Sequence, residues 1–166
     1  MSHFTQLDAY LFGQGTHYDI FRKLGAHSAK VNGQRGFYFD VWAPHAKEVH
    51  VIGEFNGWNE QANPMTRVSP EGIGVWECFI PDVKIGQMYK YLIQGGNDEK
   101  LYKADPFAEY AEVRPGTASR LWSTKGFKWT DSAWLKKRAD DTPYYEKPLS
   151  IYEVHPGSWM RHPGTD

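Results

Sequence analysis

Residues 55–59, which read Phe-Asn-Gly-Trp-Asn, form the segment whose residue types suit binding chemistry best. Trp58 stands among Asn and Gly residues, directly after a predicted strand. An exposed indole provides a stacking plane, and the amide of Asn56 provides hydrogen-bond donors and acceptors beside it. A sugar ring has the complementary surface, since its faces are apolar and its rim carries hydroxyls. The alternative is that Trp58 folds back and only anchors the loop, and the spacing leaves both interpretations open.

Two further side chains could take part in the same chemistry. Lys90 lies between Tyr89 and Tyr91, so an alternating strand places the lysine on one face and both tyrosines on the other. Lys90 has apolar neighbours on its own face. It either extends its ammonium group to solvent or directs its donors at sugar hydroxyls. Tyr102 follows a Gly-rich turn, and is either a second stacking ring or an aromatic residue at the end of a strand.

Catalytic and cofactor motifs do not stand out in this sequence. Asp140 and Asp141 lie in a polar linker and are expected to be solvated, whereas a glycosidase holds two carboxyls roughly 5–9.5 Å apart across a bond. The seven histidines include no pair at helical metal-ligand spacing with an acidic partner. No phosphate-binding loop, dinucleotide fingerprint or nucleophile elbow occurs. We therefore predict no catalytic residue, no metal site and no cofactor.

The composition narrows the classes of partner. The chain has 166 residues with 19 basic and 20 acidic side chains, and no basic run is long enough to follow a phosphate backbone. No stretch approaches the ~20 apolar residues of a membrane span, and no secretory signal is recognisable. We predict a cytoplasmic protein without nucleic-acid or membrane partners. Aromatic residues make up 16% of the chain, which suits both a core and stacking on sugars.

The periodicity predicts an all-β fold, an antiparallel β-sandwich, after a helical entry over residues 1–27. A capping box is predicted at Thr16–Asp19, ahead of an apolar stripe that ends at Gly25. In residues 36–42, Phe37, Phe39 and Val41 alternate with the intervening residues. Strands are predicted over residues 36–42, 49–55, 74–80, 88–94, 100–103 and 118–122. The sandwich domain is assigned to residues 28–125.

The alternating pattern stops after the sandwich. Residues 131–138 read as one amphipathic helix within a helix-and-linker segment over residues 126–148. Residues 148–155 then begin a new apolar strand that has no sheet partner in the sequence. Such a strand is either the start of a second domain or an edge strand laid on the first. We favour the former for residues 149–166, and predict that Ile151, Val154 and Trp159 are poorly buried.

Two motifs give this chain a family resemblance. Residues 37–46, which contain Val41-Trp42-Ala43-Pro44, and residues 49–58, which end in Phe55-Asn56-Gly57-Trp58, resemble the family 48 carbohydrate-binding module. The resemblance implies an immunoglobulin-like sandwich, found in branching and debranching enzymes and in glycogen-binding subunits of AMP-activated kinases.

Three more segments resemble bacterial 1,4-α-glucan branching enzymes, namely residues 10–27, 104–119 and 150–159. The resemblance implies that residues 149–166 correspond to the first strand of a family 13 (β/α)8 barrel. It also implies a parent enzyme of glycogen biosynthesis that transfers α-1,4-glucan chains to 6-hydroxyls by a retaining mechanism. The catalytic acids of that enzyme have no counterpart here, so this chain is expected to be inactive alone. The expected partners are an α-1,4-glucan (glycogen, starch or a maltooligosaccharide) and the catalytic barrel.

The kinase-subunit form of the module implies the binding residues. Trp58 matches its first stacking tryptophan and Lys90 matches its strand lysine. Tyr102 stands where that form has a second tryptophan. Thr117 matches a threonine of the site, whereas Ser119 replaces an asparagine. With Asn56 from the loop, the predicted glucan-binding residues are Trp58, Lys90, Tyr102, Asn56 and Thr117.

Three functions are compatible with these features. The first is the glucan-binding part of a branching enzyme, which the segment at residues 150–159 favours. The second is a stand-alone glucan-binding regulatory module, for which that segment would have no purpose. The third is an interaction domain without sugar affinity, which the combination of Trp58, Lys90 and Tyr102 disfavours.

Overall fold

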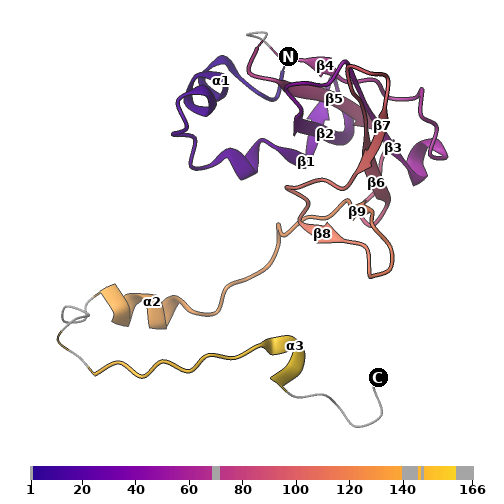
Figure 1. The fold of residues 1–166 in the computed structure, drawn as a ribbon. Helices are drawn as coiled ribbons and strands as arrows, with labels where there is room; N and C mark the ends of the chain where they lie inside the picture. Colours follow the sequence, from indigo (N-terminus) through magenta and orange to yellow (C-terminus); the bar gives the residue numbers. More distant parts are fainter. Residues whose placement is uncertain (1, 69–71, 140–145, 147, 160–166) are drawn as a thin grey trace. The chain divides into compact units, whose positions relative to one another are not determined.

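The computed structural model describes residues 2–68, 72–139, 146 and 148–159. The chain divides into two compact units, residues 1–125 and residues 126–166, which are described separately. The first unit consists of two antiparallel sheets, visible in Figure 1. None of the described helices is both long and apolar enough to cross a membrane.

The first sheet has the strand order β1-β2-β5-β4. Its strands are β1 (Gly25–Val31), β2 (Gln34–Trp42), β4 (Thr66–Arg67) and β5 (Val75–Pro81). The second sheet has the order β3-β6-β9-β8, with β7 paired to β6 outside this path. Its strands are β3 (Glu48–Gly53), β6 (Met88–Gln94), β7 (Lys100–Lys103), β8 (Tyr110–Ala111) and β9 (Ser119–Arg120).

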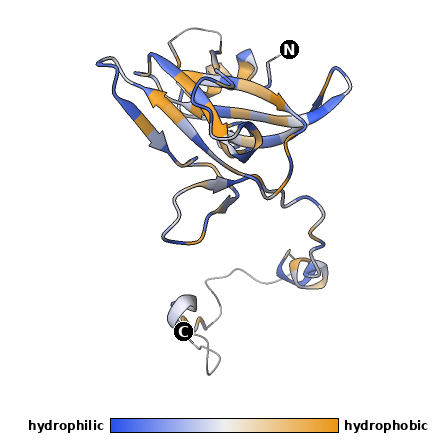
Figure 2. Ribbon diagram, turned by 90° about the vertical axis from the view of Figure 1, so that its right-hand side faces the viewer, coloured by the Kyte–Doolittle hydropathy of each residue, from blue (hydrophilic) through white to orange (hydrophobic). Residues whose placement is uncertain are grey.

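The core lies between the two sheets, and apolar residues alternate with other residues along strands such as β2 (Figure 2). Phe39 of β2 is fully buried, and its ring contacts the ring of Tyr89 of β6 edge to face at 5.2 Å. Phe37 and Val41 are buried on the same side of β2. The predicted sandwich and the predicted alternation in β2 are therefore confirmed.

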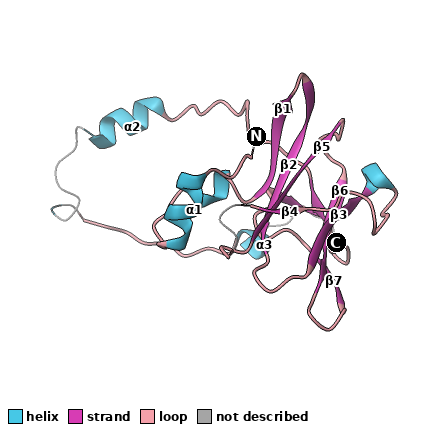
Figure 3. Cartoon of the chain, turned by 90° about the horizontal axis from the view of Figure 1, so that it is seen from above, coloured by secondary structure: helices cyan, strands magenta, loops and turns pink. Residues whose placement is uncertain are grey.

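The N-terminal segment packs separately from this core. It contains α1 (Gln6–Gly13) and the 3-10 helix η1 (Ile20–Arg22). Phe4, Ala9 and Leu24 form a second apolar cluster with Val68 and Val75, which places α1 beside the first sheet (Figure 3).

Three details of the sequence-based prediction are wrong. The capping box lies at Thr5 and Asp8 of α1, whereas Asp19, at the start of η1, makes no side-chain cap. Strand β1 was missed and begins at Gly25, within the segment predicted as helical, because pairing with β2 along its whole length overrides its weak local pattern.

The third error concerns the second unit, where residues 148–155 form neither helix nor strand. A lone strand has no hydrogen-bond partner, so an apolar pattern is not enough to form one. Ile151 is 84% exposed and Val154 is 46% exposed, as predicted. The unit contains α2 (Ser132–Ala139), close to the predicted helix, and α3 (Pro156–Trp159). Asp140 and Asp141 lie outside the described residues.

Candidate functional site

Strand β6 places its tyrosines in the core and its lysine on the outer face of the second sheet. Tyr89 and Tyr91 are fully buried, and their hydroxyls donate to Oδ2 of the buried Asp105 at 2.6 Å and 3.2 Å. The backbone N–H of Asp105 in turn donates to Oγ of Ser119 on β9 at 2.8 Å. Burial raises the pKa of Asp105 above its usual value. These bonds fix the segment after β7 and strand β9 against β6.

The predicted pair of Lys90 and Thr117 is brought together on the outer face. The Nζ atom of Lys90 donates to Oγ1 of Thr117 at 2.6 Å. Thr117 is exposed, just before β9, and the pairing of Tyr89 with Ser119 brings it beside β6. An ammonium group has three donors, so this bond leaves Lys90 further donors for a ligand.

Tyr102 lies on the same face, because it is the register partner of Leu92 on β6. Its side chain is 47% exposed, and its hydroxyl donates to Oε1 of Glu60. Oε2 of Glu60 accepts a hydrogen bond from Nζ of Lys100 at 2.6 Å. The bond from Lys100, followed by that from Tyr102, lowers the pKa of Glu60 below its usual value. Glu60 therefore fixes the orientation of the Tyr102 ring.

Glu60 was missed by the sequence analysis. It is 42 residues from Tyr102, and nothing in the local pattern sets it apart from a solvated surface acid. It lies two residues after Trp58, so it also joins the Trp58 loop to β7.

The Trp58 loop has an unusual backbone. It follows the 3-10 helix η2 (Glu54–Asn56), and both Gly57 and Trp58 have positive φ, at 64° and 61°. A bulky residue rarely adopts this left-handed conformation, which costs of order 1–3 kcal/mol and is found preferentially at functional sites. The Trp58 side chain is 39% exposed.

Asn56 maintains the shape of this loop. Its Nδ2 donates to the backbone O of Val51 at 2.9 Å and to Oδ1 of Asn63 at 2.8 Å. Its Oδ1 accepts from the backbone N–H of Gly53 at 2.9 Å. Both donors of the amide are thus used within the protein. The structure places Asn56 beneath the loop as a positioning residue, and not among the free polar groups of the site.

A small polar pocket of about 190 Å³ lies on this face. It is lined by Glu48, His50, Glu60, Gln61, Leu92, Gln94 and Lys100. The Nδ1 atom of His50 is buried and has no hydrogen-bond partner among the described residues. His50 was not identified from the sequence, because only the register of β3 with Leu92 places it here.

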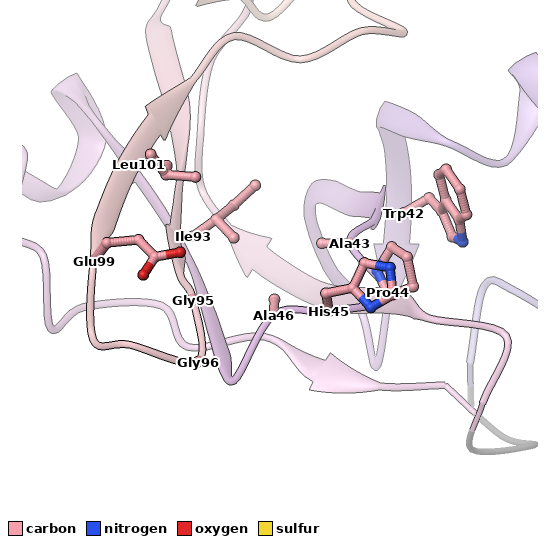
Figure 4. Close-up of a pocket in the computed structure, with 10 residues that line it drawn as sticks. All are labelled: Trp42, Ala43, Pro44, His45, Ala46, Ile93, Gly95, Gly96, Glu99 and Leu101. Atoms are coloured by element: carbon pink, nitrogen blue, oxygen red, sulfur yellow. The ribbon is translucent and has the colours of Figure 1, made fainter.

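A second cavity, of about 320 Å³, lies elsewhere on the sandwich. Figure 4 shows Glu99 and Leu101 on one side of it and Pro44 and His45 on the other. It contains none of the predicted glucan-binding residues, and most of its lining groups are apolar.

Lys90, Thr117 and Tyr102 lie on the outer face of the second sheet, and the exposed Trp58 belongs to the loop that Glu60 connects to Tyr102. These four residues are hereafter called the outer-face site. Exposed rings with polar groups at their edges can stack on a flat apolar ligand surface and form hydrogen bonds with the polar groups around it.

Comparison with known proteins gives the family of this chain. Residues 23–108, just over half of the chain, match the family described as carbohydrate-binding module 48 (isoamylase N-terminal domain). The chain belongs to this family of carbohydrate-binding modules.

Similar proteins extend the comparison to nearly the whole chain. It is 55% identical over 160 residues to the 1,4-alpha-glucan branching enzyme GlgB of Butyrivibrio fibrisolvens, covering 96% of this chain and 25% of that enzyme. It is 46% identical over 158 residues to GlgB of Bacillus subtilis, covering 95% of this chain and 25% of that enzyme. The chain thus spans about a quarter of the length of these relatives.

Among solved structures, a protein of Salmonella typhimurium that is described as a proposed alpha amylase aligns with a TM-score of 0.50. The alignment covers 68% of this chain and 17% of that chain at 15% identity, and supports the fold alone.

Proposed function

We propose that this chain is the α-glucan-binding part of a 1,4-α-glucan branching enzyme of glycogen biosynthesis. The similarity to two GlgB enzymes over more than nine-tenths of the chain supports the parent activity, a transfer of α-1,4-glucan chains to 6-hydroxyls. The similarity continues past the module into residues beyond 108, which a stand-alone regulatory module would not require.

The single observation that carries the binding proposal is that Lys90, Thr117 and Tyr102 share one face of the second sheet, and that Glu60 ties Tyr102 to the loop of the exposed Trp58. A glucan residue stacks on the Trp58 and Tyr102 rings, whose exposed apolar faces gain by being removed from water. Lys90 donates to sugar hydroxyls while Thr117 holds its ammonium group in place. Glu60 and Asn56 position the two rings without contacting the glucan.

The proposal assigns no catalytic role to this chain. Asp40 and Glu77, a close carboxylate pair on the sandwich, are 0% and 9% exposed, so a glucan cannot reach them. We assign residues 149–166 to the start of the catalytic barrel on the resemblance alone, with that barrel as the partner. A cytoplasmic location and the lack of nucleic-acid and membrane partners stay predictions from the sequence.

Affinity electrophoresis in gels containing glycogen tests this function. We expect the chain to be retarded by glycogen and not by dextran, because the site is assigned to α-1,4-linked glucose. The purified chain should leave the iodine spectrum of amylose unchanged. Equal mobility with and without glycogen would contradict glucan binding, and a changed iodine spectrum would contradict the assignment of catalysis to another part of the enzyme.

A further inference from the structure

Three side chains far apart in the sequence meet on the other sheet, under the N-terminal segment. Asp40 of β2 and Glu77 of β5 are direct register partners, so their carboxylates project on the same face. Oε2 of Glu77 accepts the backbone N–H groups of His3 and Phe4 at 2.7 Å and 2.8 Å. The Nδ1 atom of His3 lies 3.0 Å from Oδ2 of Asp40.

Two adjacent carboxylates are costly at this depth. Asp40 is fully buried and Glu77 is 9% exposed. The Oδ1 atom of Asp40 has no hydrogen-bond donor among the described residues. A buried polar atom without a partner is expensive, and two buried like charges repel strongly. The arrangement therefore needs a positive charge, either a shared proton or a cation.

The nearest lysine is already committed to other acceptors. The Nζ atom of Lys23 donates to the backbone O of His3 at 2.9 Å and pairs with Oδ2 of Asp8 at 3.0 Å. The imidazole of His3 is the nitrogen ligand beside the two acids, and its Nδ1 atom is the one that faces Asp40. A neutral imidazole is the form of histidine that coordinates metals.

One donor atom each of His3, Asp40 and Glu77 lies within 4.8 Å of those of the other two. We propose that these three residues bind a divalent transition-metal ion of the Zn²⁺ type. An imidazole with two carboxylates is a donor set that Zn²⁺ accepts, whereas Mg²⁺ and Ca²⁺ prefer oxygen ligands alone. The ion satisfies the unpaired oxygen of Asp40 and neutralises the carboxylate pair.

The position of the site gives the ion a structural role. His3 belongs to the N-terminal segment, whereas the two acids belong to the central strands of the first sheet. The His3 side chain is 22% exposed, which gives solvent and metal a route to the site. Binding therefore fastens the segment that carries Phe4 and α1 to the sandwich. The site is separate from the outer-face site, so its test does not depend on glucan binding.

The test is a thermal unfolding series on the full chain without a polyhistidine tag. After treatment with a chelator, the chain is measured alone and with Zn²⁺ or Mg²⁺, and native mass spectrometry counts the bound ions. We expect one Zn²⁺ per chain and a midpoint raised by roughly 5 °C or more at a Zn²⁺ concentration far above Kd. Mg²⁺ should have no effect.

Variants locate the bound ion. Asp40→Asn keeps the shape of the side chain and should abolish the response to Zn²⁺, as should His3→Gln at the partly exposed edge of the site. His155→Gln, an exposed histidine of the second unit, should respond like the unaltered chain. If Asp40→Asn does not fold, the response of His3→Gln to Zn²⁺ tests the proposal. The proposal is overturned if Zn²⁺ does not raise the midpoint, since a proton shared between the two acids would then account for the pair. It is also overturned if the response survives in His3→Gln, since the ion would then bind elsewhere.

Discussion

The Nζ atom of Lys90 lies 2.6 Å from Oγ1 of Thr117, although the two residues are 27 positions apart. The bond connects the centre of β6 to the segment just before β9, and it holds the ammonium group on the outer face. Lys90 is therefore placed before any ligand arrives. Preorganisation of this kind reduces the ordering cost of binding.

The first prediction concerns this pair. Lys90→Met keeps most of the aliphatic stem, removes the donors, and should weaken glucan binding by ~1 kcal/mol, about fivefold. Thr117→Val keeps the side-chain shape and should weaken binding less, because Lys90 remains but is less well held. The double variant should be no weaker than Lys90→Met alone. Calorimetric titration with maltoheptaose measures all three, and fully additive losses would show that Thr117 does not act through Lys90.

The second prediction separates the backbone of Trp58 from its ring. Glycine adopts a φ of 61° freely, whereas alanine does not, so Trp58→Gly should be more stable than Trp58→Ala by ~1 kcal/mol. Urea unfolding measures the difference. Trp129, which is 78% exposed and whose φ is not positive, provides the control, and there glycine should be no more stable than alanine. A more stable Trp58→Ala would show that the loop does not hold a strained backbone.

The third prediction concerns Glu60. Glu60→Gln loses the charge that attracts Lys100 and weakens the hold on Tyr102, so glucan affinity should fall while the fold is retained. The pKa of Glu60 is lowered in the folded chain. Its contribution to glucan affinity is therefore complete above the usual pKa of about 4.5 and is lost as the pH falls through the folded-state pKa. Glucan titrations at decreasing pH should show this loss of affinity in the unaltered chain but not in Glu60→Gln.

Glu99→Gln is the control for this prediction, because Glu99 lines the cavity of Figure 4. This variant should keep the glucan affinity of the unaltered chain, and a loss of affinity would contradict the location of the site.

The fourth prediction concerns Asp40 in the chelator-treated chain. Burial, followed by the charge of Glu77, raises the pKa of Asp40 to about 10. The folded state then retains a proton that the unfolded state releases, so stability falls as the pH rises from about 4 towards the folded-state value. Between about pH 7 and 10, where His3 is neutral throughout, Asp40→Asn should remove most of this decline. Urea unfolding across this pH range measures the decline in stability. Asp82→Asn is the control, and its stability should fall with pH as much as that of the unaltered chain.

The sequence predicted the features that depend on short-range alternation. The alternation put Phe37 and Phe39 on one face of β2, which the structure shows to be the core face. It also put Tyr89 and Tyr91 on the face of β6 opposite to Lys90, and the structure shows both rings buried. Local turn signals and the two motif segments were sufficient for the fold class.

Features that depend on distant partners were not predictable in this way. Glu60 acquires its role from Tyr102 and Lys100 on another strand, and β1 forms because β2 pairs with it. Residues 148–155 show the reverse case, in which an apolar pattern without a partner forms no strand. The cluster of His3, Asp40 and Glu77 could not be predicted from metal-ligand motifs. Such motifs consist of residues close in sequence, whereas these three residues come from separate segments.

The central claim is that the face carrying Trp58 binds an α-glucan. Calorimetric titration of the chain with maltoheptaose, beside Trp58→Ala and the exposed control Trp129→Ala, tests it most directly. We predict saturable binding that Trp58→Ala weakens at least tenfold, about 1.4 kcal/mol, and that Trp129→Ala leaves unchanged. The absence of binding by the unaltered chain, or equal affinities for all three proteins, would contradict the claim.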